Sequence, residues 1–324
     1  MGDTGTGSGT SGDLRCCITQ ADGAGGTIDF SVTGTIQLTK ALPALGGGLG
    51  ITINGPGASS LTVRGGGTSS NFSVFNVTSG ANAAISGLTI EGANASSSAI
   101  DNAGTLTLTN STLANNSASS RGGAIFNDSG ATLTVTGSTL ASNSTESFGG
   151  GIYNAGTLTV TGSTLANNSA NGSGGGINTD GTLTVADSTL ASNSAREFGG
   201  FGGGIENFGT LTLTNSTLVN NSASLLGGGI DGSSVTLVNS IVAGNKSGTS
   251  GNNPDDISSG SINTTNSFNN LIGTGGAGGL TNGTNGTKIG VANSGLGTLG
   301  NYGGRPRPSR SYPEAPPSTP ATTA

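Results

Sequence analysis

An eleven-residue pattern that occurs six times constrains the fold of this chain more than any other feature. Its first copy is LTLTNSTLANN, which ends at Asn116, and later copies end 27, 25, 25, 28 and 24 residues further on. No copy gains or loses a residue, so the length varies only between copies. A fixed period of this size is typical of a repeat array whose units stack on one another, not of a single globular core.

The amino-acid composition indicates a thin, regular core. The chain has 324 residues with 63 Gly, and only 8% of its residues are charged and 4% aromatic. Such small side chains cannot fill a thick layered core. Disordered chains combine low hydrophobicity with high charge, whereas here the charge is low and Leu, Ile and Val recur at fixed places.

Each repeat contains three candidate strands. The second strand, LT[LV]T, alternates so that Leu133 and Val135 face inward while its threonines face outward. The third strand is STLxxN. The first strand is a G-G-[AG]-I segment, whose inward residues are Ile125, Ile152, Ile177, Ile205 and Ile230.

Two further positions in the repeat predict turns. The residue between the second and third strands is always Gly, Asn or Asp, which favours a left-handed corner. These residues are Asn110, Gly137, Gly162, Asp187, Asn215 and Asn239. The third strand always ends in Asn, and side chains stacked about 4.8 Å apart can form an amide ladder. These residues are Asn116, Asn143, Asn168, Asn193, Asn221 and Asn245.

The pattern predicts an all-β chain that forms one parallel β-helix. We expect about ten coils over residues 30–304, most regular over about 100–245. Residues 1–29 are predicted to be a flexible lead-in followed by a cap. The cap is a short helix in GDLRCCITQAD, where Leu14, Cys17 and Ile18 fall on one face. The Pro-rich residues 305–324 are predicted to be disordered.

Several functional classes are disfavoured. The chain has no His and no Trp, so catalysis or metal binding through His is absent. The net charge is −6 and the basic residues are mostly scattered, so nucleic acid is not an expected partner. Cys16 and Cys17 are adjacent, which strains a bond between them. No apolar run reaches membrane-spanning length, and no signal peptide precedes Gly2, so any export signal is expected to lie outside this chain.

The repeat resembles a known bacterial type. The G-G-[AG]-I segment followed by LTxTNSTLxxN is similar to the polymorphic outer-membrane-protein type repeat of bacterial right-handed parallel β-helix proteins. GDLRCCITQAD and the strands after it resemble the CSLREA-type opening of these proteins. NSFNNLIG and LGTLGNYGG resemble the region before their choice-of-anchor Q segment. The resemblance covers nearly all of residues 12–304 and implies a right-handed β-helix, secreted or displayed on the cell surface.

The tail departs from that family, and a frameshift explains the departure. Such proteins continue after the double Gly as GPTxTxxLLxGSPAIDxG. A gene encoding GGPTQTIALLPGSPAIDTG, with one base deleted after the second glycine codon, can encode the GGRPRPSRSYPEAPPSTPAT found here. We therefore expect residues 305–324 to be a frameshifted remnant, which resequencing of the gene would test.

The leading functional hypothesis is an adhesin-like scaffold at the cell surface without its own chemistry. Large side chains on the loop before the first strand are the candidate binding surface for an extracellular glycan or protein. They are Arg121, Phe148, Phe198, Phe201, Leu225 and Leu226. The alternative is that these side chains fold back over the coils.

The second hypothesis is a polysaccharide-active enzyme, because this fold also includes pectin lyases. Glu206 and Asp231 each follow an inward Ile, are 25 residues apart and should stack. They could act as an acid/base pair or bind a cation, but we expect them on a solvated exterior. Asp255 and Asp256 are a candidate Ca²⁺ site, and no other cofactor is expected.

The third hypothesis is ice binding through rows of outward threonine. Successive T-x-T segments form a flat array like that of some β-helical antifreeze proteins. Ala186 and Val238 interrupt it, and outward Thr is common on any strand surface. The threonines are Thr105, Thr107, Thr109, Thr132, Thr134, Thr136, Thr157, Thr159 and Thr161.

Overall fold

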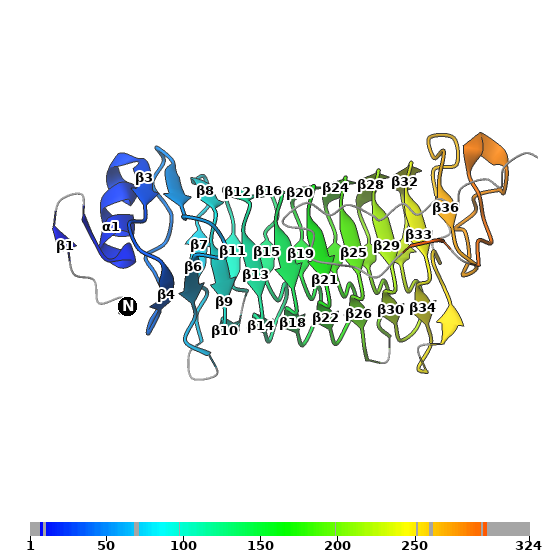
Figure 1. Cartoon of the computed structure of the whole chain (residues 1–324), viewed down its shortest axis with the longest axis horizontal. Coiled ribbons are helices and arrows are strands. Elements are labelled where there is room, and N and C mark those ends of the chain that lie inside the picture. The colour runs from blue at the N-terminus through cyan, green and yellow to red at the C-terminus, as the bar shows by residue number, and fades with distance from the viewer. Residues whose placement is uncertain are drawn as a thin grey trace, which may run out of the picture.

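The computed structural model describes residues 7–8, 11–67, 71–96, 98–197, 199–250, 252–258, 262–292 and 294–296. Over these residues the chain forms a parallel β-solenoid of short strands (Figure 1). The all-β parallel β-helix predicted from the repeat is confirmed. The predicted disordered tail, residues 305–324, lies outside the described residues.

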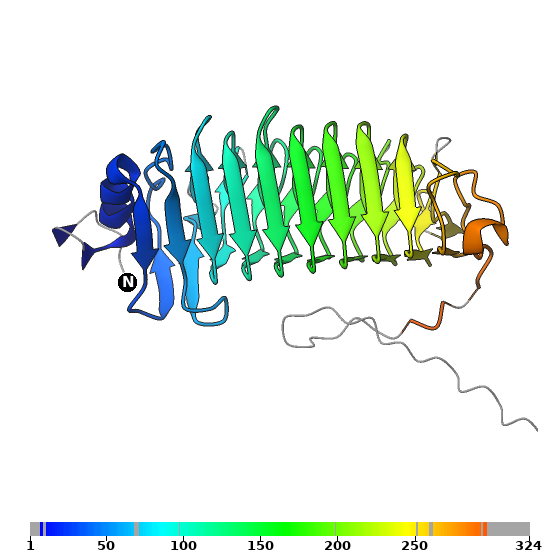
Figure 2. The same ribbon diagram turned by 90° about the horizontal axis from the view of Figure 1, so that it is seen from above.

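Each regular turn passes in order through four sheets, which run along the solenoid axis (Figure 2). Sheet 1 contains β3 (Gly26–Asp29), β5 (Ile51–Asn54), β8 (Asn82–Ser86), β12 (Thr105–Thr109), β16 (Thr132–Thr136), β20 (Thr157–Thr161), β24 (Thr182–Ala186), β28 (Thr210–Thr214) and β32 (Val235–Val238). Sheet 2 contains β4 (Gly34–Gln37), β6 (Leu61–Arg64), β9 (Thr89–Glu91), β13 (Thr112–Ala114), β17 (Thr139–Ala141), β21 (Thr164–Ala166), β25 (Thr189–Ala191), β29 (Thr217–Val219), β33 (Ile241–Ala243) and β36 (Leu271–Ile272).

The other two sheets are built from shorter strands. Sheet 3 contains β10 (Asn94–Ala95), β14 (Ser117–Ala118), β18 (Ser144–Thr145), β22 (Ser169–Ala170), β26 (Ser194–Ala195), β30 (Ser222–Ala223), β34 (Lys246–Ser247) and the antiparallel β35 (Asn253–Pro254). Sheet 4 contains β7 (Phe75–Val77), β11 (Ile100–Asn102), β15 (Ile125–Asn127), β19 (Ile152–Asn154), β23 (Ile177–Thr179), β27 (Ile205–Asn207) and β31 (Ile230–Gly232). A hairpin of β1 (Gly7–Ser8) and β2 (Ser11–Gly12) and the 3₁₀ helix η2 (Thr284–Gly286) complete the described elements.

Two details differ from the sequence prediction. The three expected strands correspond to sheets 4, 1 and 2, and a fourth strand of two residues follows the ladder Asn to form sheet 3. A strand this short shows no alternation by which the sequence could reveal it. Sheet 1 has nine strands, one per turn, so the solenoid has about nine turns where about ten were expected.

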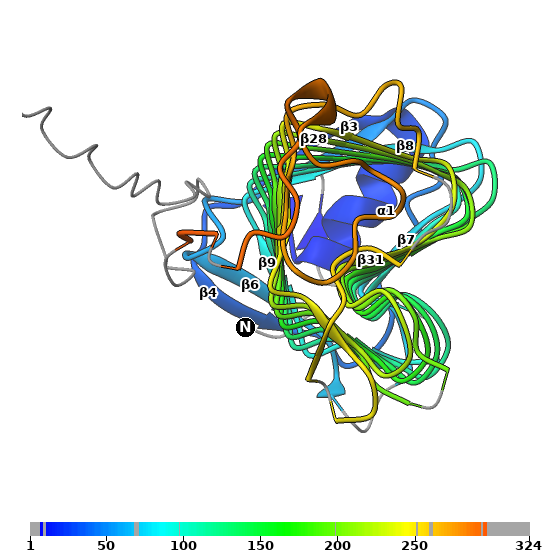
Figure 3. The same ribbon diagram turned by 90° about the vertical axis from the view of Figure 1, so that its right-hand side faces the viewer.

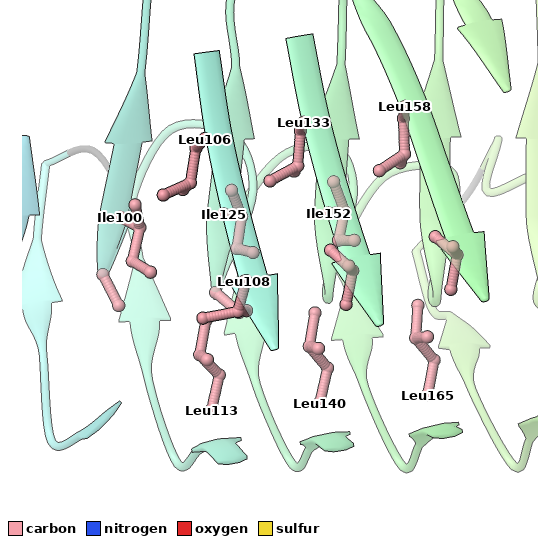
Figure 4. Close-up of a cluster of buried hydrophobic side chains, with 14 of the residues drawn as sticks. Ile100, Leu106, Leu108, Leu113, Ile125, Leu133, Leu140, Ile152, Leu158 and Leu165 are labelled. Atoms are coloured by element: carbon pink, nitrogen blue, oxygen red, sulfur yellow. The ribbon is translucent and has the colours of Figure 1, made fainter. Parts of the chain in front are cut away.

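The core is a set of parallel stacks of aliphatic side chains (Figure 4). Ile100 on sheet 4, Leu106 and Leu108 on sheet 1 and Leu113 on sheet 2 are fully buried, and the next turn repeats them in register. Burial of each such side chain stabilises the fold by about 1.5–3 kcal/mol. All six predicted corner residues between sheets 1 and 2 have φ values of 48–57°, as expected.

Helix α1 (Leu14–Ala24) lies across the N-terminal end of the solenoid (Figure 3). Asp13 caps it, because its carboxylate accepts a hydrogen bond from the Cys16 amide at 3.0 Å. Leu14 and Ile18 are buried against the first coil, and Cys17 packs beside them. The predicted cap helix is therefore present, and it shields core residues that the first coil would otherwise expose.

Candidate functional site

The outer face of sheet 4 carries a column of polar and aromatic side chains, one from each turn. Each directly follows the inward Ile of its strand, and the strands pair in parallel register, so neighbouring members lie one above the other. We call this set the sheet-4 column. It consists of Asp101, Phe126, Tyr153, Asn178, Glu206 and Asp231.

An aromatic cluster occupies the N-terminal part of the column. The rings of Phe126 and Tyr153 stack with centroids 5.5 Å apart and planes inclined by 6°. The Arg121 guanidinium lies 4.7 Å from the centroid of the Tyr153 ring and donates a hydrogen bond to its hydroxyl at 3.0 Å. That hydroxyl donates to Asp180. Burial, and then the bond to Asp180, raise the pKa of Tyr153 to about 12, so the phenol stays neutral.

The C-terminal part of the column is acidic and buried. Glu206 and Asn178 are each only 2% exposed, which corrects the expectation that Glu206 lies on a solvated exterior. The reason is the glycine turn before sheet 4. A Cβ added at Gly202 would lie 2.4 Å from the Ile205 carbonyl oxygen and 2.5 Å from the Glu206 amide nitrogen, so this turn runs directly against the column. Asp231 is half-buried.

The environment of Glu206 favours its protonated form. Burial raises the pKa of Glu206 to about 8, and the negative charge of Asp231 adds to the effect. A pKa near neutrality is the property of a general acid. However, an acid that is 2% exposed leaves no room for a sugar ring to reach it, so its geometry does not support the acid/base pair considered from the sequence.

The predicted binding loops form a ridge beside the column. Arg121 pairs with Phe148 and Phe201 with Leu226 through isolated parallel bridges, so equivalent loop residues stack between turns. Phe148, Leu225 and Leu226 are 38%, 46% and 47% exposed, whereas Phe201 is half-buried. The side chains thus fold back only in part. Phe198, the remaining predicted member, lies outside the described residues.

The six ladder asparagines lie in one buried row. From Asn143 onward, each side-chain oxygen accepts from the backbone and side-chain nitrogens of the previous rung; for example, Asn143 Oδ1 lies 3.1 Å from Asn116 N and 2.9 Å from Asn116 Nδ2. Each side-chain nitrogen also donates to a leucine or isoleucine carbonyl one turn back, as Asn143 does to Leu113 at 3.0 Å. The row satisfies backbone groups that the turn leaves unpaired.

The ladder ends on Asp256, which argues against the predicted Ca²⁺ site. Asp256 Oδ1 accepts from Asn245 N and Nδ2 at 2.9 Å, and its Oδ2 accepts from Gly275 N at 3.1 Å. Asp255 Oδ2 accepts from Gly227 N at 2.8 Å. Asp256 is fully buried and its neighbour nearly so. These N–H groups already occupy the oxygens that a cation would need.

Two further polar rows were not predicted from the sequence. The first Ser of each STL strand accepts a backbone N–H from the previous turn, as Ser138 does from Ser111 N at 3.1 Å. A second amide row lies on the inward face of sheet 4, opposite the sheet-4 column. In this row Asn102 donates to Asn127 and Asn127 to Asn154, both at 2.7 Å. The Ser shared by all six modules, and the Asn found two residues after Ile100, Ile125, Ile152 and Ile205, were available signals for these rows.

The threonine rows of sheet 1 are in register. Thr132, Thr134 and Thr136 pair with the corresponding threonines of the next turn, and the middle row is half-buried. At the N-terminal end of this face a shallow hollow of about 450 Å³ includes Leu49, Thr105 and Thr107 in its lining. The array thus has the regular geometry that the third hypothesis needs.

A family model described as the right-handed beta helix region matches residues 73–242, more than half of the chain. The chain therefore belongs to the right-handed β-helix family. No curated protein and no solved structure matches it significantly. Within the described residues, no helix is both long and apolar enough to cross a membrane, and no three His, Cys, Asp or Glu side chains are grouped to hold a metal ion.

Proposed function

We propose that this chain is a non-catalytic surface scaffold that binds a partner through the loop ridge beside sheet 4. The observation that carries the proposal is the exposure of Phe148, Leu225 and Leu226 on the loops before sheet 4. Exposed apolar side chains that gather along one edge of a molecule are typical of interaction sites. The two most exposed side chains of the ridge, Leu225 and Leu226, favour an extracellular protein surface over a glycan, because leucine has no ring face on which a sugar can stack.

The test is binding of the purified full chain to a panel of immobilised extracellular proteins and glycans, with a product assay on every hit. Saturable binding without turnover supports the scaffold, and protein hits identify the favoured partner class. Turnover of a polysaccharide that is lost in Glu206→Gln or Asp231→Asn would instead support the pectin lyase-like alternative. A chain that binds nothing on the panel counts against a binding role for the ridge.

We further propose that the protein acts outside the cell, on a bacterial outer surface. The support is the resemblance of its repeats to the polymorphic outer-membrane-protein type and of its N-terminal segment to the CSLREA type. Protease treatment of intact expressing cells tests the location. Loss of the protein from intact cells supports surface display, and protection until the cells are lysed contradicts it.

Ice binding is the second candidate, because sheet 1 presents threonine rows in strict register. Thermal hysteresis of the purified protein tests it directly. Thr134→Leu and Thr159→Leu should abolish hysteresis, since both residues lie in the middle row of this face. Thr164→Leu, on the outer face of sheet 2, is the matched control and should leave it unchanged. Equal effects at all three positions, or no hysteresis in the wild type, reject this function.

A further inference from the structure

Three successive turns place two carboxylates and one amide next to each other in the sheet-4 column. Asn178 pairs with Glu206, and Glu206 with Asp231, in the parallel ladder. Paired strands lie about 4.8 Å apart. Among the described residues, Glu206 Oε2 and Asn178 Nδ2 are buried and have no hydrogen-bond partner.

The unpartnered Glu206 oxygen calls for a physical explanation. A buried polar atom without a partner is costly, and a buried carboxylate more so. The neighbour Asp231 adds a second negative charge, and its Oδ1 accepts from the Ser258 hydroxyl. The sheet-4 column contains no Lys or Arg, so no cationic side chain of this row can offset the two carboxylates.

We propose that Glu206, Asp231 and Asn178 bind a divalent cation of the Ca²⁺ class on the outer face of sheet 4. An ion with ligand distances of about 2.3–2.6 Å can bridge carboxylates from adjacent strands. Rotation of the Asn178 amide turns its oxygen, in place of the unpartnered nitrogen, toward the ion. The half-buried Asp231 provides the entry side, and water completes the shell.

The chemistry of the site selects the type of ion. All its side-chain ligands are hard oxygens, which suit Ca²⁺, Mg²⁺ and Mn²⁺, and the site has none of the Cys or His ligands that are typical of Zn²⁺ and Cu²⁺ sites. Three ligands held in a straight row, at the spacing of the strands, do not provide octahedral geometry. Ca²⁺ accepts irregular coordination, whereas Mg²⁺ demands a near-ideal octahedron. The site should therefore prefer Ca²⁺ over Mg²⁺.

A proton shared between Glu206 and Asp231 is the competing explanation. It would satisfy Glu206 Oε2 without any ion, by a hydrogen bond from the protonated to the ionised carboxyl group. The two explanations differ in an observable way. A cation site binds Ca²⁺ in solution, and a shared proton does not.

The experiment is calorimetric titration of the EDTA-stripped full chain with Ca²⁺ at pH 8, together with thermal unfolding with and without the ion. We expect saturable binding with a Kd of about 10⁻⁴–10⁻³ M, as in extracellular modules, and a higher unfolding midpoint. Glu206→Gln and Asp231→Asn should each weaken binding at least tenfold and remove the shift. Asp128→Asn, a change at an exposed acid after β15, is the matched control and should retain both.

Two results would overturn the proposal. One is a wild type that shows neither heat of Ca²⁺ binding nor a Ca²⁺-dependent change of its unfolding midpoint. If Glu206→Gln is then more stable than the wild type, the shared proton is the explanation. The other is binding that persists in both Glu206→Gln and Asp231→Asn. The Gln side chain is isosteric with the protonated acid, so this variant should fold, and far-UV circular dichroism confirms it.

Discussion

At the scale of single residues, the direction of the asparagine ladder explains why it ends on an acid. Along the row itself, each asparagine donates to the next rung toward the C-terminus and accepts from the N-terminal side, from Ala93 N on Asn116 Oδ1 through to Asn245 on Asp256 Oδ1. In the part of the chain that the structure describes, no asparagine follows Asp256 in this row to accept a hydrogen bond from it, and Asp256 Oδ2 accepts one from Gly275 N instead. A residue that only accepts is therefore suited to this position.

Replacing this last acceptor should destabilise the C-terminal turn. Asp256→Asn places an NH₂ donor near either Asn245 or the Gly275 amide, and one buried N–H loses its acceptor. We expect the free energy of unfolding to fall by about 1–3 kcal/mol, measured by denaturant titration. An unchanged midpoint would show that the ladder does not depend on this acceptor.

The stability of the apo protein should depend on Glu206 between about pH 4.5 and 8. The pKa of Glu206 is raised from 4.5 to about 8, first by burial and then by Asp231. In this window the folded chain holds a proton that the unfolded chain has lost, so stability falls as pH rises, by at most about 1.4 kcal/mol per unit, and levels off above the folded pKa.

Urea unfolding in EDTA across this range tests that dependence. Glu206→Gln should flatten this part of the pH profile, because its amide does not titrate. Asp128→Asn alters an exposed acid and should leave the slope as in the wild type. An identical slope in Glu206→Gln and the wild type would assign the effect to other groups.

At the scale of the elements, the sequence predicted the inward side chains and the corner of each turn. It did not predict the glycine turn that covers the outer face of sheet 4. Alternation in LTVT fixed which side chains face inward, and six Gly, Asn or Asp residues fixed the corner. Alternation also placed Glu206 outside the sheet, correctly, but it could not show that the glycine turn before β27 packs against that outer face. Burial there comes from backbone contact, which leaves no periodic trace in the sequence.

The glycine turn can be tested with two Gly→Ala variants. Gly202 has a φ of 60° and no space for a Cβ, whereas Gly130 has a φ of 80° with nothing within 4 Å of an added Cβ. Gly130→Ala should cost about 1–2 kcal/mol, the usual penalty of left-handed backbone. Gly202→Ala adds a clash with the Ile205 backbone and should cost more. Equal losses in thermal unfolding experiments would contradict the close packing of this turn.

At the scale of the whole molecule, the solenoid is a rigid support that repeats one surface at each turn. The core side chains of each turn pack on those of the next, and the strands and buried polar rows are hydrogen-bonded between turns. Helix α1 covers the N-terminal end. Binding then depends on the few large or charged outward side chains that stand among the small polar ones. The repeat pattern revealed this architecture from the sequence alone. The partner was not predictable in the same way, because recognition depends on the shape of the loop ridge.

The most direct test of the binding role compares Leu225→Ser/Leu226→Ser with Leu49→Ser in binding to whichever partner the wild type captures. Leu49 is 76% exposed and lies on the sheet 1 side, away from the ridge, so it controls for the loss of any exposed leucine. We expect at least tenfold weaker binding for the ridge variant, with an unchanged unfolding midpoint, and wild-type affinity for Leu49→Ser. Equal affinity of all three proteins would contradict it.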